Sequence, residues 1–149
     1  MIPRYGEPIK SGMRYRQRTG AYAVLGRDGQ VLLTHQLRPV DEFQLPGGGV
    51  DTGESHIQAL HREVLEETGW SISSPTKLGV FRRFTYMPDY DIWAEKICHI
   101  YFARPVLRMS DPVEPFHSAV WTTRSEAIDA IVNEGDAHFL WRALTSRKF

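Results

Sequence analysis

Three glutamates, Glu63, Glu66 and Glu67, recur at helical spacing within one short segment of the sequence. At about 100° per residue, positions i, i+3 and i+4 fall within an arc of about 100° on a helix. An acidic face turned to solvent is the ordinary interpretation. Two features favour a bound cation: like charges four residues apart destabilise a helix by ~0.2–0.5 kcal/mol, and the helix dipole disfavours anions at a C-terminus. Three carboxylates on one face suit Mg²⁺, which prefers oxygen ligands.

A run of glycines lies upstream of the glutamates, in the segment Pro46-Gly47-Gly48-Gly49. Glycine lets a backbone approach an ion or a phosphate closely and offer a carbonyl oxygen to it. Tight turns also use glycine, so this run supports a metal site only together with the carboxylates.

The glutamates are expected on a helix that runs from residue 55 to residue 68. Ser55 and Gln58 have the spacing of a capping box, in which each side chain bonds a free backbone N–H of the first turn. Gly69 stands where a C-terminal cap is expected. The residues predicted to line the buried face are Ile57, Leu60, Val64 and Thr68.

Strands and helices alternate along the rest of the chain. Residues 1–13 are expected to be an irregular lead-in, and an Asp-Gly turn at 28–29 between two apolar runs predicts a hairpin. The link over residues 85–95 is long enough to be a functional loop. The predicted strands cover residues 19–25, 30–35, 43–45, 77–84, 96–103 and 118–122. This pattern predicts an α/β fold with a mixed sheet between helices.

Two further helices are expected near the C-terminal end. Thr123 and Glu126 form a second capping box, and Asp136 is a candidate cap for the last helix. The residues expected to face inward are Ala127, Ile128, Ile131 and Val132 in the first of these helices, and Phe139, Leu140, Ala143 and Leu144 in the second.

Composition limits the partners and the compartment. A chain of 149 residues matches one ordinary domain. Proteins that bind nucleic acids usually carry a surplus of basic residues, so a net charge of zero argues against a nucleic-acid partner. No stretch approaches the ~20 apolar residues that cross a bilayer, so no membrane partner is expected. The single cysteine, Cys98, lies in an apolar run and is expected to be a buried thiol. One cysteine and the lack of a signal-peptide pattern predict a cytoplasmic location.

The glycines, the glutamates and one arginine stand at spacings that resemble the Nudix box, over residues 48–70. Val64 fills its first aliphatic position, and Trp70 is the one departure, since Ile, Leu or Val is usual there. A strand with Trp121 that leads into an Ala-rich helix adds to the similarity. The fixed positions of the box are all present: Gly48, Glu54, Arg62, Glu63, Glu66, Glu67 and Gly69.

The resemblance to the Nudix (MutT-like) hydrolases implies a single domain over residues 1–149 with an α/β/α sandwich fold. It implies a Mg²⁺-dependent pyrophosphohydrolase, with Mn²⁺ as an alternative ion, that cleaves a diphosphate linkage by water attack on phosphorus. The substrate class stays open between nucleotide sugars, dinucleoside polyphosphates and (deoxy)nucleoside triphosphates, and the oligomeric state between monomer and homodimer. The alternative is a catalytically silent nucleotide-sensing module, which is expected to have lost box carboxylates; this chain has them all.

The resemblance also implies roles for single residues. Glu63, Glu66 and Glu67 are expected to supply metal carboxylates, with the general base left open among them. The carbonyl of Gly48 is a further expected ligand, and Arg62 is expected to orient a carboxylate. Glu54, at the start of the helix, is expected to complement its dipole.

Weaker candidates lie outside the box. One more acidic ligand is expected from a later loop, with Glu114 preferred and Glu95 second. Tyr86 is a candidate for stacking on a base. Guanidinium groups match phosphate geometry, which makes candidate phosphate ligands of Arg38, Arg82 and Arg83. An ordinary surface role is the alternative for each of these residues.

Overall fold

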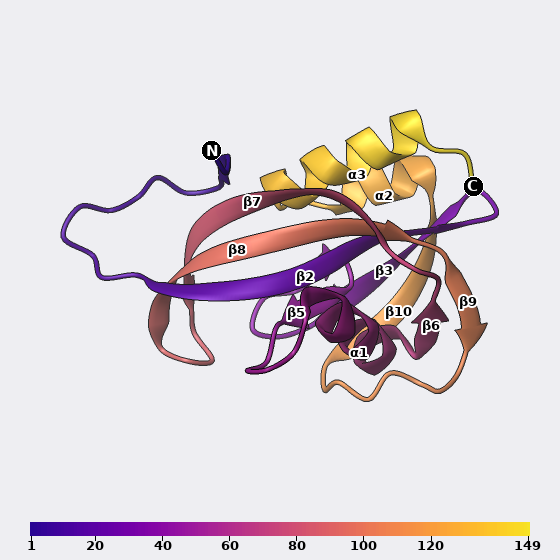
Figure 1. Ribbon diagram of the computed structural model, residues 1–149, viewed down its shortest axis with the longest axis horizontal. Helices are drawn as coiled ribbons and strands as arrows, with labels where there is room; N and C mark the ends of the chain where they lie inside the picture. The colour runs from indigo at the N-terminus through magenta and orange to yellow at the C-terminus, as the bar shows by residue number, and fades with distance from the viewer.

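A mixed sheet with helices on both of its faces forms the centre of the protein (Figure 1), and the computed structural model describes all residues, 1–149. The eight-stranded main sheet has the order β1-β7-β8-β2-β3-β10, with β4 beside β3 and β5 beside β2, while β6 and β9 form a separate pair. The elements are β1 (Arg4–Tyr5), β2 (Arg16–Arg27), β3 (Gln30–Gln36), β4 (Glu42–Gln44), β5 (Gly47–Gly49), α1 (His56–Thr68), β6 (Trp70–Ile72), β7 (Thr76–Met87), β8 (Ile92–Ala103), β9 (Pro105–Arg108), β10 (His117–Thr123), α2 (Arg124–Ala130) and α3 (Glu134–Ser146).

Two hydrophobic cores lie on opposite faces of this sheet, because successive side chains of a strand point to opposite sides. Leu25 of β2 packs with Leu60 of α1 in one core, whereas its neighbour Val24 packs with Leu140 of α3 in the other. Figure 1 shows α2 and α3 together on one face and α1 on the other. The predicted α/β/α sandwich with a mixed sheet is therefore confirmed. No helix of the protein is long and apolar enough to cross a bilayer.

The first helix forms as its sequence predicts. Ser55 accepts a hydrogen bond from the Gln58 N–H while the Gln58 side chain accepts one from the Ser55 N–H, which completes the capping box. Gly69 ends the helix in the left-handed region, at φ 78°, where glycine carries no steric penalty. The predicted hairpin of β2 and β3 around Asp28 and Gly29 is also present.

Some predicted boundaries were wrong. The segment 85–95 is mostly strand, because β7 and β8 continue their antiparallel pairing through Thr85 opposite Ala94 to Met87 opposite Ile92. Residues 1–13 contain the short strand β1, which pairs with β7. Strands β6 and β9 were not predicted; they pair with each other across a long stretch of sequence, which no local pattern reveals.

Some residues that were predicted to face the core do not do so, and one predicted helix cap was wrong as well. Ile57, Ile128 and Val132 are exposed. Ile128 lies on the outer side of α2, next to the buried Ala127, and Val132 lies beyond the end of α2 at Ala130. The cap of α3 is Asn133, whose side chain accepts from two backbone N–H groups; Asp136 lies inside the first turn and is buried.

A pair of histidine rings joins the start of α1 to the sheet and makes stability depend on pH. The rings of His56 and His99 lie 4.1 Å apart, and Lys77 Nζ lies 3.0 Å from His99 Nδ1. Burial, His56 and Lys77 lower the pKa of His99 from 6.5 to about 4. The unfolded chain therefore binds this proton first, so stability present above pH 6.5 is lost as the pH falls towards 4.

We expect His99→Phe, which keeps an aromatic ring but cannot titrate, to lose less stability than the wild type between pH 7.5 and pH 5.5. Urea unfolding of both proteins at the two pH values measures the difference. The carboxylates and the histidines that do not contact His99 are the same in both proteins, so their contributions to the pH dependence cancel. Parallel pH profiles would contradict this role of His99.

Candidate functional site

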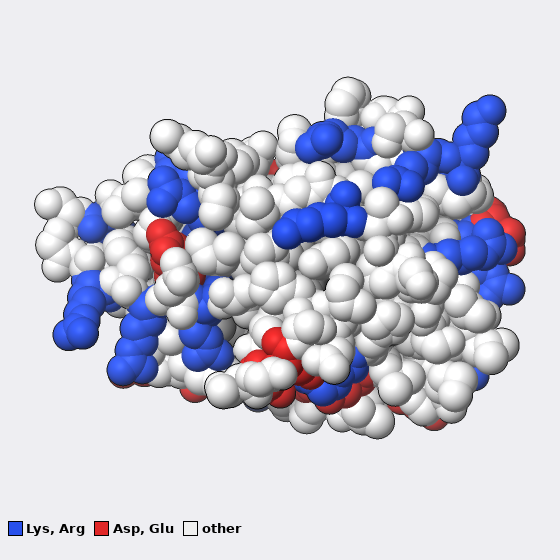
Figure 2. Space-filling view, viewed as in Figure 1, with Lys and Arg blue, Asp and Glu red and all other residues white.

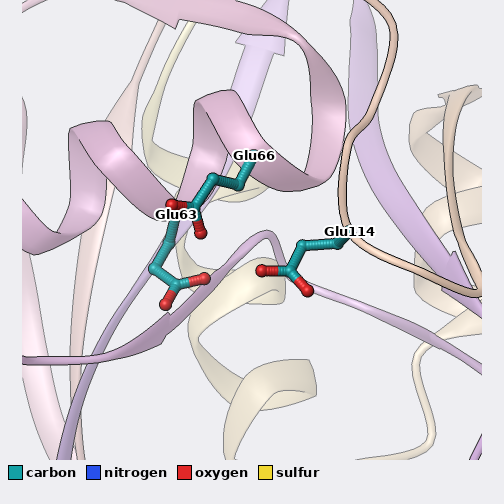
Figure 3. A group of neighbouring side chains, drawn as sticks. All are labelled: Glu63, Glu66 and Glu114. Atoms are coloured by element: carbon teal, nitrogen blue, oxygen red, sulfur yellow. The ribbon is translucent and has the colours of Figure 1, made fainter.

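Three carboxylates converge at one end of α1. Glu63 and Glu66 extend from the helix, and Glu114 extends toward them from the segment between β9 and β10 (Figure 3). One oxygen from each lies within 4.8 Å of the others. Helical spacing explains the first two, but the third comes from a residue far along the chain.

Backbone hydrogen bonds hold the segment of Glu114 against the end of α1. The last carbonyls of a helix have no partner inside it. Here the Glu66 carbonyl accepts from the N–H groups of Val113 and Glu114, at 2.8 and 3.2 Å, and the Gly69 carbonyl accepts from Met109 at 2.7 Å. A Cβ on Gly69 would lie 1.8 Å from the Ser110 carbonyl oxygen, so only glycine permits this approach. The helix end thus places Glu114 beside the box glutamates.

Arg62 links the helix to the glycine segment. Its Nε donates to Glu54 at 2.7 Å, its Nη1 donates to Glu63 at 3.0 Å, and its Nη2 donates to the Gly49 carbonyl at 3.0 Å. The guanidinium lowers the pKa of Glu54 to about 2. Arg62 therefore orients Glu63, and Glu54 in turn holds Arg62.

Glu67 lies apart from this trio. Its carboxylate accepts from the Gly47 N–H at 2.7 Å and lies 3.3 Å from His117 Nδ1. Gly47 adopts φ 147°, which favours glycine, and thereby points its N–H at the helix. Glu67 thus ties β5 to α1, and its expected role as a metal ligand stays a prediction.

The acidic groups are costly to keep ionised where they lie. Burial raises the pKa of Glu63 and of Glu66, and their neighbouring carboxylates raise it further, against the lowering effect of Arg62. Burial also raises the pKa of Glu67 well above its usual value. Carboxylates gathered at this cost indicate a site for a cation.

The geometry of Gly48 fits the same interpretation. A Cβ on this residue would lie 2.5 Å from Cδ of Glu63, so the absence of a side chain is what leaves room for that carboxylate. The donors gathered here are hard oxygens, without histidine or cysteine in the trio, which suits a divalent ion such as Mg²⁺ rather than zinc. The residues therefore fit a divalent cation.

A cavity of about 280 Å³ opens beside the carboxylates. Glu63 and Glu114 line one part of it, whereas Arg83, Lys96 and Asp136 line another. A ligand in this space would contact both Glu63 and Glu114 and the basic side chains of β7 and β8.

A model of the Nudix domain matches residues 14–142 of this sequence. The chain belongs to the Nudix family. A Bacillus subtilis (strain 168) protein provisionally named an 8-oxo-dGTP diphosphatase is 41% identical over 74 residues, which are 50% of this chain and 50% of that protein. An RNA pyrophosphohydrolase of Ruthia magnifica subsp. Calyptogena magnifica is 47% identical over 66 residues, or 42% of this chain and 36% of that protein. The matched segments span half or less of these curated relatives.

Solved structures of the Nudix family share the fold. A Nudix hydrolase from Nitrosomonas europaea has a TM-score of 0.73 at 20% identity, covering 90% of this chain and 93% of that one. A MutT Nudix hydrolase from Burkholderia pseudomallei has a TM-score of 0.68 at 26% identity, covering 85% of this chain and 97% of that one. The sandwich found here is thus the Nudix fold.

Some of the candidate ligands outside the Nudix box lie away from the site of this Nudix domain. Glu95 bonds Gln17 and lies 3.6 Å from Arg82, away from the trio that Glu114 joins. Arg82 lies outside the cavity lining, and Arg38 is exposed with its guanidinium over the ring of Phe116.

Arg83 and Tyr86 lie nearer to the cavity. Arg83 lines the cavity and also an adjoining groove of about 400 Å³, in which Tyr86 lies. Tyr86 donates to Asp91 at 2.5 Å. Basic side chains also gather at the end of the molecule where β2 begins and the β7–β8 hairpin turns (Figure 2).

Three residues of the site have no signal in the sequence that singles them out. Lys96 and Asp136 line the cavity, and His117 lies beside Glu67. Lys96 follows Glu95, His117 precedes Ser118, and Asp136 ends the polar run 133–136, so nothing in the sequence separates these residues from ordinary surface residues.

Proposed function

We propose that this chain is a Mg²⁺-dependent pyrophosphohydrolase that forms one Nudix domain and cleaves the diphosphate linkage of a small nucleotide-type substrate. Mn²⁺ is the alternative ion. The observation that carries the proposal is the trio of Glu63, Glu66 and Glu114. Two of its members, Glu63 and Glu114, line the same cavity as Arg83 and Lys96. Acidic groups for a cation and basic groups for phosphate therefore share one space.

The residues divide the work of the reaction as follows. Glu63, Glu66 and Glu114 would hold the divalent ion, with the Gly48 carbonyl as a further ligand. When bound, the ion polarises phosphate oxygens and lowers the pKa of an attacking water. Arg62 keeps the Glu63 carboxylate in place.

Two basic side chains are suited to the substrate. Arg83 and Lys96 are opposite each other on β7 and β8 and lie on the same face of the sheet. Neither forms an ion pair with a carboxylate, so both are free to donate to phosphate oxygens.

A substrate panel tests the proposal. Purified protein with Mg²⁺ is expected to hydrolyse at least one member of a panel of nucleotide sugars, dinucleoside polyphosphates and (deoxy)nucleoside triphosphates, with EDTA abolishing the reaction. The relative named as an 8-oxo-dGTP diphosphatase makes (deoxy)nucleoside triphosphates the first to try. Inactivity across the panel by folded, metal-binding protein would favour the nucleotide-sensing alternative.

The adjacent arginines of β7 provide a matched pair of variants. We expect Arg83→Gln to lower kcat/KM about 10- to 100-fold, the usual effect of losing a charge-assisted hydrogen bond. Arg82→Gln removes the same charge one residue away, outside the cavity, and is expected to change kcat/KM less than about threefold. Steady-state kinetics of both variants measures the difference, and equal losses would remove Arg83 from substrate binding.

A further inference from the structure

His117 is a mostly buried side chain of the cavity that the proposed hydrolysis does not use. Only 12% of its side chain is exposed, and it lines the cavity beside Glu67. Its ring nitrogen Nδ1 is buried and has no hydrogen-bond partner in the protein, although Glu67 Oε2 lies 3.3 Å away. Buried polar atoms are nearly always hydrogen-bonded, because leaving one unpaired costs free energy. An unpaired nitrogen this close to a carboxylate therefore indicates a contact that the working site completes.

The backbone next to His117 adopts a strained conformation. Phe116 has φ 64°, in the left-handed region that bulky residues rarely enter. Such strain persists only where the surrounding structure imposes it, and it tends to occur at functional sites. Here the Phe116 carbonyl accepts from the Leu37 N–H at 2.9 Å, and Cζ of Arg38 lies 5.2 Å from the centre of the Phe116 ring. The chain thus holds an unfavourable turn at the point where β10 begins with His117.

This one turn of the chain contacts both groups of carboxylates. Glu114 joins the acidic trio, and its carbonyl accepts from the His117 N–H at 3.4 Å. The ring of His117 reaches Glu67, which lies apart from the trio. The other oxygen of Glu67, Oε1, accepts from the Gly47 N–H at 2.7 Å. His117 is therefore placed to hold the second oxygen of a carboxylate whose first oxygen is already bonded.

We propose that His117 is a positioning residue for the hydrolysis, which donates its Nδ1–H to Glu67 Oε2 and fixes the direction of that carboxylate in the cavity. The inference rests on the proposed function, because Glu67 is one of the acidic groups of the proposed site. A carboxylate that is bonded through one oxygen can still rotate, whereas bonds to both oxygens hold its plane. Partners that orient the groups of a metal site typically contribute 10- to 100-fold to its activity or metal affinity.

Asparagine and leucine at this position separate the N–H group from the bulk of the ring. Both side chains branch at Cγ into two terminal atoms, as the inner part of the histidine ring does, but only asparagine offers an N–H in the place of Nδ1. We expect His117→Asn to keep kcat within about threefold, and His117→Leu to lower kcat about 10- to 100-fold with little change in KM. Steady-state kinetics measures both values, and thermal melts show that both variants fold.

His35→Asn is the control for losing a histidine beside a carboxylate. His35 lies opposite Ser118, the neighbour of His117 on β10, and its Nε2 lies 2.6 Å from Asp41. It does not line the cavity, so its kcat is expected to stay within about threefold of the wild type. Equal losses in His117→Asn and His117→Leu, or full activity in His117→Leu, would overturn the role of the Nδ1–H group.

A spectroscopic measurement needs no catalysis. Nitrogen chemical shifts distinguish a ring nitrogen that carries hydrogen from one that does not, and the His117 signals are those that His117→Asn lacks. At pH 8 a neutral histidine ring carries a single hydrogen, which is expected on Nδ1 of His117. A hydrogen on Nε2 alone would overturn the proposed contact with Glu67. Failure to hydrolyse any substrate by a protein whose Nδ1 carries this hydrogen would instead overturn the proposed hydrolysis.

Discussion

Glu66→Gln is expected to lower kcat on the order of 10³-fold while leaving the protein folded. Glutamine keeps the shape of the side chain but removes one of the three charges that would hold the divalent ion. In the structure an oxygen of the Glu66 carboxylate lies within 4.8 Å of one oxygen each of Glu63 and Glu114, and the Glu66 backbone carbonyl also anchors the segment of Glu114. The substitution leaves that carbonyl in place, so the loss reports on the carboxylate alone.

Metal binding is measured separately from activity. A ligand that binds only the folded state raises its stability. Mg²⁺ is therefore expected to raise the Tm of the wild type and to raise that of Glu66→Gln much less. Without metal the variant is expected to be at least as stable as the wild type, because removing one of several crowded carboxylates relieves their repulsion.

Glu95→Gln is the control. It removes the same charge from the other acidic residue considered for the site, which bonds Gln17 instead of joining the trio. Its kcat is expected to stay within about threefold of the wild type. Full activity in Glu66→Gln, or an equal loss in Glu95→Gln, would remove the trio from catalysis.

The contrast between Glu66 and Glu114 shows which site residues can be predicted from the sequence. Glu66 belongs to a local pattern, in which spacing along a helix fixes which side chains share a face. The same kind of local rule predicted the capping box of Ser55 and the end of the helix at Gly69, and both are present. The position of Glu114 depends on hydrogen bonds from the N–H groups of Val113 and Glu114 to the Glu66 carbonyl at the end of α1, which is distant in the sequence. From sequence it was only one of two acidic candidates.

Asp136 illustrates a different limit. Its type and its place near a helix start made it a candidate cap, but Asn133 is the cap and Asp136 lies inside the first turn. Whether a carboxylate near a helix start meets solvent or a cavity depends on what packs against that turn. Here Phe81 of β7 and the absence of a side chain at Gly135 decide it. Burial of this kind follows from tertiary packing and leaves no periodic signal in the sequence.

Gly48→Ala is expected to lower kcat/KM on the order of 10²-fold with little loss of stability. The added Cβ would lie 2.5 Å from Cδ of Glu63 and 2.6 Å from its Oε2, so that carboxylate must move away from the trio. The atoms that must shift are the end of a flexible side chain, and Gly48 does not adopt a positive φ, so the backbone is able to accept alanine. Steady-state kinetics and a thermal melt measure the two effects.

Gly49→Ala distinguishes the room that Gly48 leaves for Glu63 from the flexibility of the glycine run. No atom lies within 4 Å of a Cβ at Gly49, and its φ is not positive either, so this variant is expected to keep its activity within about threefold. Both substitutions remove one glycine from the same strand and restrict the unfolded chain equally. A loss confined to Gly48→Ala, together with a smaller rise of Tm with Mg²⁺, is therefore what a displaced Glu63 carboxylate predicts. Equal losses of activity in the two variants would mean that the glycines serve the flexibility of β5. The room that Gly48 leaves for the Glu63 carboxylate would then not explain the loss.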